Sequence, residues 1–113
     1  MAQDIHATLT NCGMSAQKVR LVLDMVRGKP ATDALNILHF TPKLAARYVH
    51  KLVTSAVANA EENFGVSRDN LYIYRITADV APTRKWRRFG ARGRFKPLLK
   101  RASHLSVVLR EKE

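Results

Sequence analysis

A block of eighteen residues, 84–101, constrains the fold of this chain more than any other feature. Half of its residues are basic, none is acidic, and three aromatic residues are interspersed among them. So dense a run of one charge sign repels itself and cannot bury an apolar face of its own. The block is therefore predicted to project from the folded core and to need a partner that supplies negative charge. Its basic residues are Arg84, Lys85, Arg87, Arg88, Arg92, Arg94, Lys96, Lys100 and Arg101, and its aromatic residues are Trp86, Phe89 and Phe95.

The net charge of +11 is distributed very unevenly along the chain. Residues 1–78 carry nine basic against six acidic residues, whereas residues 79–101 carry nine against one. Arginine outnumbers lysine in the block, and its planar guanidinium suits bidentate contact with phosphate and stacking on bases. The interspersed aromatic rings can stack on bases as well. This pattern favours nucleic-acid binding over a merely solvated surface.

The length of 113 residues predicts one domain with a core that can fold alone. We expect the core to comprise residues 1–80 and 102–113, and an arm to cover about 81–101. A lone cysteine, Cys12, excludes an internal disulfide and suits a reducing compartment. No apolar run reaches the length of a membrane span, and Gln3–Asp4 interrupts the start before a signal-peptide core. A cytoplasmic protein with no membrane partner is expected.

Three helices are predicted from apolar residues that recur every three or four positions. The first follows the N-cap Ser15 and runs to about Arg27. The second covers about Ala31–His39, and the third opens on Thr41 as its cap and runs to about Glu62. The apolar residues assigned to their buried faces are Val19, Val22, Leu23, Val26, Ala34, Leu35, Leu38, Phe40, Leu44, Ala45, Tyr48, Leu52, Val53, Ala56, Val57 and Ala60.

Three segments alternate with a period of two and are predicted to be strands: Gln3–Thr10, Leu71–Val80 and Ser103–Arg110. A turn is expected over residues 11–13 and a loop over 66–70. The residues assigned to the buried faces of the strands are Ile5, Ala7, Leu9, Tyr72, Tyr74, Ile76, Ala78, Val80, Leu105, Val107 and Leu109.

The last two strands flank the basic block, so the simplest topology pairs them in antiparallel fashion. The block then becomes a hairpin with about ten residues in each arm and a reach of roughly 30 Å. A two-stranded ribbon without a core is marginal in water, so its tip is expected to be mobile until a partner orders it. The predicted fold class is α+β: three helices packed on a small three-stranded antiparallel sheet, with a long protruding basic β-hairpin.

No pattern in the sequence indicates an enzyme. Ser15 and Lys18 match the Ser-x-x-Lys spacing of penicillin-interacting serine enzymes, but the companion motifs are absent. The four histidines have no metal-type spacing among themselves or with Cys12, and the acidic residues are too scattered to form an acid–base pair. We expect no catalysis, no cofactor and no metal.

Two kinds of DNA-binding protein are alternatives to an RNA-binding one. The first two helices could form a helix-turn-helix, but the exposed positions of the second, from Thr32 to His39, include no basic residue. Paired β-ribbons also wrap DNA in architectural proteins. Those proteins are intertwined dimers, which a self-contained core does not require, and this alternative stays open to test.

Six motifs occur in a distinctive order and spacing over nearly the whole chain. They are Ser15-Ala-Gln-Lys-Val-Arg-Leu-Val, Val26-Arg-Gly-Lys, Ser55-Ala-Val-Ala-Asn-Ala-Glu-Glu-Asn, Pro82, Ala91-Arg-Gly-Arg and Lys100-Arg-Ala-Ser-His-Leu-Ser-Val-Val. Together they closely resemble the bacterial-type large-subunit ribosomal protein twenty-two family. The chain departs from the family at Phe89–Gly90, where a Pro-Arg pair is more usual.

The resemblance implies a protein that binds large-subunit (23S-type) ribosomal RNA and aids assembly of the cytoplasmic large subunit as a monomer within it. It implies that the hairpin lines the nascent-peptide exit tunnel opposite a loop of ribosomal protein four and meets the nascent polypeptide. The residues it implies in RNA binding are Gln17, Lys18, Arg20, Arg84, Lys85, Trp86, Arg87, Arg88, Arg92, Arg94, Lys96, Lys100 and Arg101. Those it implies at the tunnel-facing tip are Arg84, Lys85, Trp86, Arg87, Arg88, Phe89, Gly90, Ala91 and Arg92.

Overall fold

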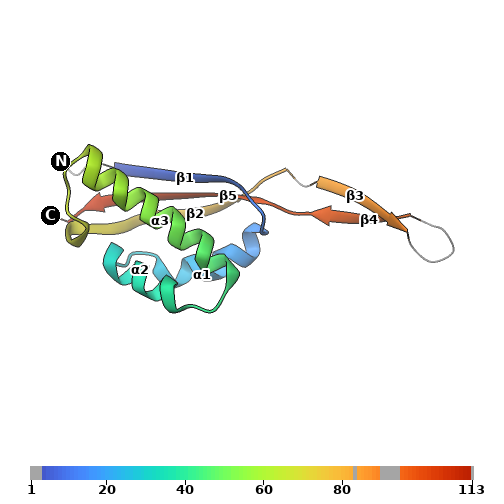
Figure 1. Ribbon diagram of the computed structural model, residues 1–113, viewed down its shortest axis with the longest axis horizontal. Helices are drawn as coiled ribbons and strands as arrows, with labels where there is room; N and C mark the ends of the chain where they lie inside the picture. Colours follow the sequence, from blue (N-terminus) through green and yellow to red (C-terminus); the bar gives the residue numbers. More distant parts are fainter. Residues whose placement is uncertain (1–3, 83, 90–94, 113) are drawn as a thin grey trace.

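The computed structural model describes residues 4–82, 84–89 and 95–112 (Figure 1). Within these residues it contains three α-helices, one short 3₁₀ helix and five strands in two sheets. The elements in chain order are β1 (Asp4–Cys12), α1 (Ala16–Val26), α2 (Ala31–Phe40), α3 (Leu44–Asn63), η1 (Arg68–Asn70), β2 (Leu71–Val80), β3 (Arg84–Phe89), β4 (Phe95–Lys100) and β5 (Ser103–Glu111).

Strand β5 is the central strand of the larger sheet, whose order is β1-β5-β2. Both neighbours run antiparallel to it, and Val107 lies opposite Ala7 on one side and Ile76 on the other. The predicted pairing of the two strands that flank the basic block is therefore confirmed, as β2 with β5. Strands β1 and β2 are the two edge strands. Within the described residues, the outer side of β2 pairs at an isolated antiparallel bridge between Pro30 and Tyr72, where the Ile73 N–H donates a 2.9 Å hydrogen bond to the Lys29 carbonyl.

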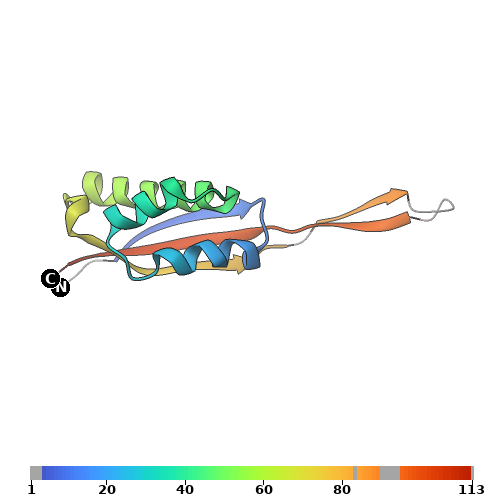
Figure 2. The same cartoon turned by 90° about the horizontal axis from the view of Figure 1, so that it is seen from below.

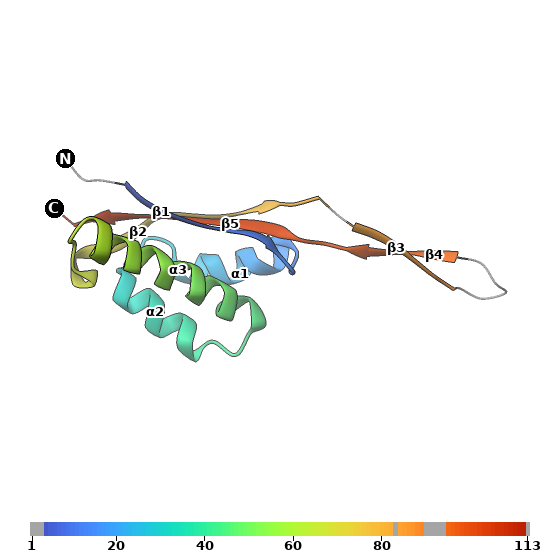
Figure 3. The same cartoon turned by 45° about the horizontal axis from the view of Figure 1, so that its top comes forward.

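The three helices all cover one face of this sheet, which makes two layers (Figure 3). Figure 2 shows the helices side by side along the sheet, with the arm projecting beyond them. The predicted α+β fold class is confirmed. In the described part of the chain, no helix is both long and apolar enough to cross a membrane.

The core lies between the two layers, and each large apolar side chain buried there stabilises the fold by about 1.5–3 kcal/mol. All the large apolar residues predicted on the inner face of α1 are buried, as are those predicted on β5. The central buried side chains are Val19, Val22, Leu23, Val26, Leu52, Val53, Ile76, Leu105, Val107 and Leu109.

Strand β2 turns a different set of residues toward the core from the set predicted. Ile73 is fully buried, whereas Tyr74 is 45% exposed and Tyr72 is half-buried. The register against β5 shifts between Ile73 and Arg75, so that Tyr74 is an extra residue in the ladder. A bulge of this kind inverts which residues of the preceding stretch face the core. Strict alternation counted from Ile76 was therefore wrong for both tyrosines.

The connection between α2 and α3 also differs from the prediction. Thr41 ends α2 instead of capping α3, because its hydroxyl donates a 2.6 Å hydrogen bond to the Ile37 carbonyl. Helix α3 begins at Leu44 with Lys43 at its N-cap. The later start leaves Leu44 55% exposed, and Phe40 at the end of α2 is 79% exposed. Both had been assigned to the core, and both assignments were wrong.

Two boundaries differ by a few residues. Strand β1 continues through Asn11 and Cys12, where a turn was predicted, and its register shifts between Leu9 and Cys12. The Cys12 side chain is buried. The predicted loop over 66–70 contains the 3₁₀ helix η1.

The basic block forms a separate two-stranded antiparallel sheet, hereafter the arm. Arg84 lies opposite Lys100 at the end nearest the domain, and Phe89 lies opposite Phe95 at the far end. Six residues of each strand are paired, compared with the ten or so expected. Of the predicted tip, residues 84–89 belong to β3, and the remaining residues, from 90 on, lie outside the described residues.

The arm joins the domain as a continuation of β2 and β5. At the junction the Ala81 N–H donates a 3.0 Å hydrogen bond to the Ala102 carbonyl. The whole molecule measures 64 × 25 × 18 Å, and the arm extends along its longest dimension (Figure 1).

The arm is expected to be dispensable for folding, because its two strands pair only with each other within the described residues. We predict that replacing residues 84–100 with a short glycine-containing turn lowers the free energy of unfolding by about 1 kcal/mol or less, a shift of roughly 4–8 °C at most in Tm. Leu52→Asp, which buries an unpaired charge, should abolish folding. Circular dichroism melting measures both. Failure of the arm-less chain to fold would contradict a core that is independent of the arm.

Candidate RNA interface

A cavity of about 860 Å³ lies where the arm leaves the domain, and we call it the arm-base cavity. Its walls come from the start of α1, the turn before it and the residues that join the arm to β2 and β5. Gln17, Lys18 and Arg20 line it together with Arg101. Val80, which had been assigned to the core, is 73% exposed and lines it as well. The fold thus brings together two groups of predicted RNA-binding residues that are far apart in the sequence.

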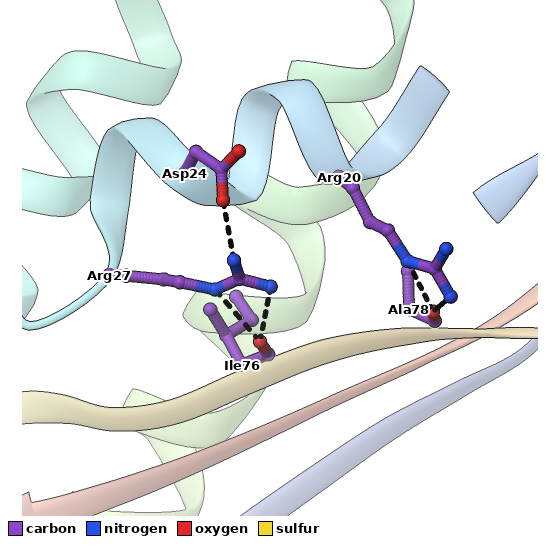
Figure 4. Close-up of polar contacts among 5 residues, drawn as sticks. All are labelled: Arg20, Asp24, Arg27, Ile76 and Ala78. Atoms are coloured by element: carbon purple, nitrogen blue, oxygen red, sulfur yellow. Dashed lines mark hydrogen bonds and ion pairs between the residues drawn. The ribbon is translucent and has the colours of Figure 1, made fainter. Parts of the chain in front are cut away.

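The Arg20 guanidinium is held in a defined position at this cavity. Its Nε and Nη2 groups both donate to the Ala78 carbonyl, at 3.1 and 2.8 Å (Figure 4). Ala78 belongs to the edge strand β2, so this carbonyl group lies where hydrogen bonds to a further strand would form. A neutral carbonyl leaves the positive charge uncompensated, and only two of the five N–H donors are used. Arg20 is therefore oriented by the fold and can still bind an anion.

Arg27 has a related arrangement two turns further along α1. Its Nε and Nη2 groups donate to the Ile76 carbonyl, both at 3.4 Å, and its Nη1 group pairs with Asp24 (Figure 4). Together Arg20 and Arg27 cover the outer edge of β2, which protects that edge from pairing with another strand. The difference is that Asp24 compensates the charge of Arg27, whereas no carboxylate in the described residues pairs with Arg20.

Ser103 is a buried residue that holds the turn beside the arm-base cavity in place. Its side chain is fully buried, and its hydroxyl donates a 2.9 Å hydrogen bond to the Met14 carbonyl. Met14 lies in the turn before α1, and Ser103 is the first residue of β5 after the arm. This bond therefore ties the start of α1 to the root of the arm.

The ion pairs of the described residues all lie away from the arm-base cavity. The hydrogen bond from Arg110 holds the pKa of Asp4 below its usual value, and the hydrogen bond to Glu61 raises the pKa of Arg68. The cations at the cavity have no such acidic partner within the described residues. The three pairs are Asp24–Arg27, Glu61–Arg68 and Asp4–Arg110.

The other predicted RNA-binding residues lie in the arm. Residues 84–88 belong to β3, and Lys96 and Lys100 belong to β4. In the register Arg84 lies opposite Lys100, and Arg88 lies opposite Lys96. Like charges at directly opposed positions disfavour a free ribbon, so an anionic partner would stabilise it. Four predicted residues lie outside the described part of the chain: Gly90, Ala91, Arg92 and Arg94.

A second cavity, of about 740 Å³, was missed by the sequence reading. It lies at the connection between α2 and α3, hereafter the α2–α3 corner, and is lined by His39, Lys43, Arg47 and His50 among others. The sequence does contain a sign of this basic surface, because Lys43, Arg47 and Lys51 are spaced by four and so lie on one face of the helix. The apolar residues that predicted α3 lie on a different face and do not reveal it.

His39 and His50 lie near each other at the α2–α3 corner, with ring centroids 6.3 Å apart. Over the residues that the structure describes, no group of three or more histidine, cysteine or acidic side chains is arranged to hold a metal ion.

A helix-covered antiparallel sheet that extends into a basic β-arm is the architecture expected of the family resembled above. Residues 7–110 match the family model for ribosomal protein L22p/L17e. The chain is 50% identical over 107 residues to the large ribosomal subunit protein uL22 of Caldicellulosiruptor saccharolyticus, covering 95% of this chain and 88% of that protein. It is also 50% identical over 100 residues to the uL22 of Thermoanaerobacter pseudethanolicus, covering 88% of this chain and 90% of the relative.

The chain belongs to the L22p/L17e family of ribosomal proteins. This is a family of structural proteins, so the expectation that the chain is not an enzyme is confirmed.

Ser103→Ala should destabilise the domain, because it leaves the Met14 carbonyl without its partner in a buried setting. We expect a loss of about 1–2 kcal/mol in the free energy of unfolding, measured by urea denaturation. Ser106→Ala is the matched control, since Ser106 lies on the same strand but is only half-buried. Equal effects of the two substitutions would mean that the bond to Met14 does not stabilise the fold.

Proposed function

We propose that this protein is a structural constituent of the large ribosomal subunit, and that it binds large-subunit ribosomal RNA through the arm and the arm-base cavity. The observation that carries the proposal is the convergence of Lys18, Arg20 and Arg101 at the root of the arm without acidic partners among the described residues. Membership of the L22p/L17e family supports the ribosome as the setting. The names of the relatives support the large subunit.

The geometry supports a positioning role for the cavity. Arg20 is held by two hydrogen bonds, so a phosphate bound to its remaining donors would be fixed relative to the sheet. Lys18 and Arg101 line the same cavity and add positive charge to it. A rigid body that binds several phosphates in this way holds together RNA segments that would otherwise repel each other.

The arm extends this neutralisation beyond the domain. Its strands carry six basic residues, and a seventh, Arg101, follows directly after β4. The six are Arg84, Lys85, Arg87, Arg88, Lys96 and Lys100. A two-stranded ribbon is thin enough to enter spaces between RNA helices that a globular domain cannot enter. By likeness to the family, the arm lines the nascent-peptide exit tunnel opposite ribosomal protein four, and the protein acts as a monomer in cytoplasmic ribosomes.

Binding to RNA should be steeply salt-dependent. If most of the arm's cations engage phosphates, the slope of log K against log[salt] should be roughly −6 to −8. We suggest measuring it by filter binding to an in vitro transcript of the source organism's large-subunit ribosomal RNA. A slope shallower than about −3 would mean that the basic block is not the main binding surface.

Paired variants test the arm-base cavity in the same assay. Lys18→Gln combined with Arg101→Gln should make the slope shallower by about 2, because each substitution removes the cation that neutralises one phosphate. The control is Lys29→Gln combined with Lys112→Gln, which removes the same charge from exposed sites away from the cavity. Equal changes of slope in both variants would indicate binding through net charge alone.

A competition experiment tests the architectural-DNA alternative. If duplex DNA of equal length competes as well as structured RNA does, that alternative is favoured.

Shortening the arm should separate docking from the function of its far end. Replacing residues 89–95 with Asn-Gly leaves the Arg88–Lys96 pair as the last of the ribbon and preserves its register. Because the base of the arm and the arm-base cavity are kept, we expect normal amounts of large subunits in sedimentation profiles. By likeness to the family, sensitivity to tunnel-binding macrolides and the stalling of arrest peptides should change. Unchanged drug and stalling responses would mean that the arm serves only to clamp RNA, and loss of large subunits would mean that its far end is needed for assembly.

A further inference from the structure

The α2–α3 corner combines a cavity, unpaired positive charge and an exposed aromatic ring. Lys43 and Arg47 line the cavity with His39 and His50, and no acidic side chain is among the described residues that line it. Phe40 lies beside it, because its ring makes an edge-to-face contact with His39 at a centroid distance of 4.9 Å and an interplanar angle of 82°. The arm and the arm-base cavity do not account for any of these features.

The exposure of Phe40 follows from how the fold ends α2. The hydrogen bond from Thr41 to the Ile37 carbonyl closes the helix immediately after Phe40. The ring is 79% exposed, and Leu44 across the connection is 55% exposed. The His39 and Phe40 rings are nearly perpendicular, so His39 does not stack flat on the phenyl ring, and its high exposure leaves a face open for a flat group to stack on.

The positions of the charged residues along α3 destabilise this helix in the free protein. Lys43, Arg47 and Lys51 occupy its N-terminal half at spacings of four, and Glu61 and Glu62 lie in its last turn. Like charges four residues apart repel each other along a helix, and cations are favoured at the opposite end of the helix dipole. An anionic partner at the corner would compensate both effects.

We propose that the α2–α3 corner is a second RNA-binding surface, which stacks an unpaired base on Phe40 and binds the adjoining phosphates with Lys43 and Arg47. The inference rests on the proposed function, because it assumes that RNA is the partner of the protein. RNA suits the corner because one ligand supplies both a flat ring and an anion within a nucleotide. An acidic protein segment would satisfy the cations but would supply no flat ring for Phe40.

The corner and the arm-base cavity lie at the same end of the domain. Leu44 lines both cavities, so they adjoin around the start of α3. Helices α1 and α3 both begin at the end from which the arm projects (Figures 1 and 3). One RNA segment could therefore run from the root of the arm across Leu44 to Phe40, and the corner would bind a part of the RNA that the arm does not reach.

The test uses the full chain with a single tryptophan as a fluorescent probe of stacking. Trp86→Phe removes the natural indole and keeps an aromatic ring in the arm. In that background, Phe40→Trp places an indole at the corner. Phe64→Trp is the matched control, because Phe64 is a 45% exposed aromatic residue at the C-cap of α3, the end of that helix away from the corner, next to Glu61 and Glu62. Each protein is titrated with the large-subunit RNA transcript, and filter binding is measured in parallel.

Stacking of a base should quench the indole at position 40 and leave that at position 64 unchanged. Phe40→Ala should weaken binding to the transcript by about tenfold, in line with the loss of one stacked base. In the Phe40→Trp protein, adding Lys43→Gln and Arg47→Gln should move the quenching to higher RNA concentration. Retained folding is checked by circular dichroism for every variant.

Three results would overturn the proposal, and they have different meanings. If filter binding is retained but neither indole is quenched, the corner does not bind RNA while the proposed function stands. If polyglutamate quenches the corner indole as well as RNA does, the surface takes an acidic polypeptide. If no variant, nor the unmodified chain, binds the transcript, the proposed function fails and this inference fails with it.

Discussion

The pairing of β2 with β5 is the interaction on which the rest of this structure depends. The residues between the two strands carry too much charge of one sign to be buried, so they cannot contribute to a core. The strands on either side must therefore meet across them, and β5 then provides the central strand against which β1 also pairs. The helices cover the one face that these three strands make apolar. The basic block is expelled as an arm, and its root is set by the last residues of β2 and the first of β5.

The same pairing determines where the positive charge of the domain gathers. Because the arm leaves at one end of β2 and β5, Arg101 lies at that end, and the start of α1 brings Lys18 and Arg20 to it. Hydrogen bonds from two side chains reinforce this arrangement. Arg20 donates two of them to the Ala78 carbonyl at the edge of β2, and Ser103 donates one to the Met14 carbonyl from inside the core. These bonds join α1 or the turn before it to the strands that carry the arm. The proposed interface is therefore assembled by the fold, and its charge comes from the composition of the segments that meet there.

Among the described residues, some cations pair with a carboxylate and others do not. Arg27, Arg68 and Arg110 each pair with a carboxylate. These exposed pairs contribute little to stability individually, but in each pair the carboxylate compensates the positive charge of the arginine. At the arm-base cavity and the α2–α3 corner, no described carboxylate plays that part. A protein that stores unpaired charge at one end trades some of its own stability for affinity towards a polyanion.

The sequence predicted the elements that depend on periodicity and on charge. The inner faces of α1 and β5 follow from the spacing of apolar residues, which reports local geometry directly. The projection of the basic block as an arm follows from its charge. Gln17, Lys18 and Arg20 were selected through the family resemblance, and the sequence alone provided no reason for them to lie near Arg101. That proximity is a property of the folded sheet.

Other features were decided only by tertiary structure. The bulge at Tyr74 reverses the pattern of β2, and it is visible only in the register against β5. The exposure of Phe40 depends on whether the Thr41 hydroxyl binds the helix before it or the helix after it, and the sequence permits both. In each case the local sequence is compatible with two arrangements, and packing against the neighbouring element selects one. The sequence by itself determined that this chain has an apolar core and a basic arm. The reason is that each residue's preference for the core or for water depends on its own charge and polarity. Which cations stand together was decided by the tertiary structure, because that depends on contacts between segments far apart in the chain.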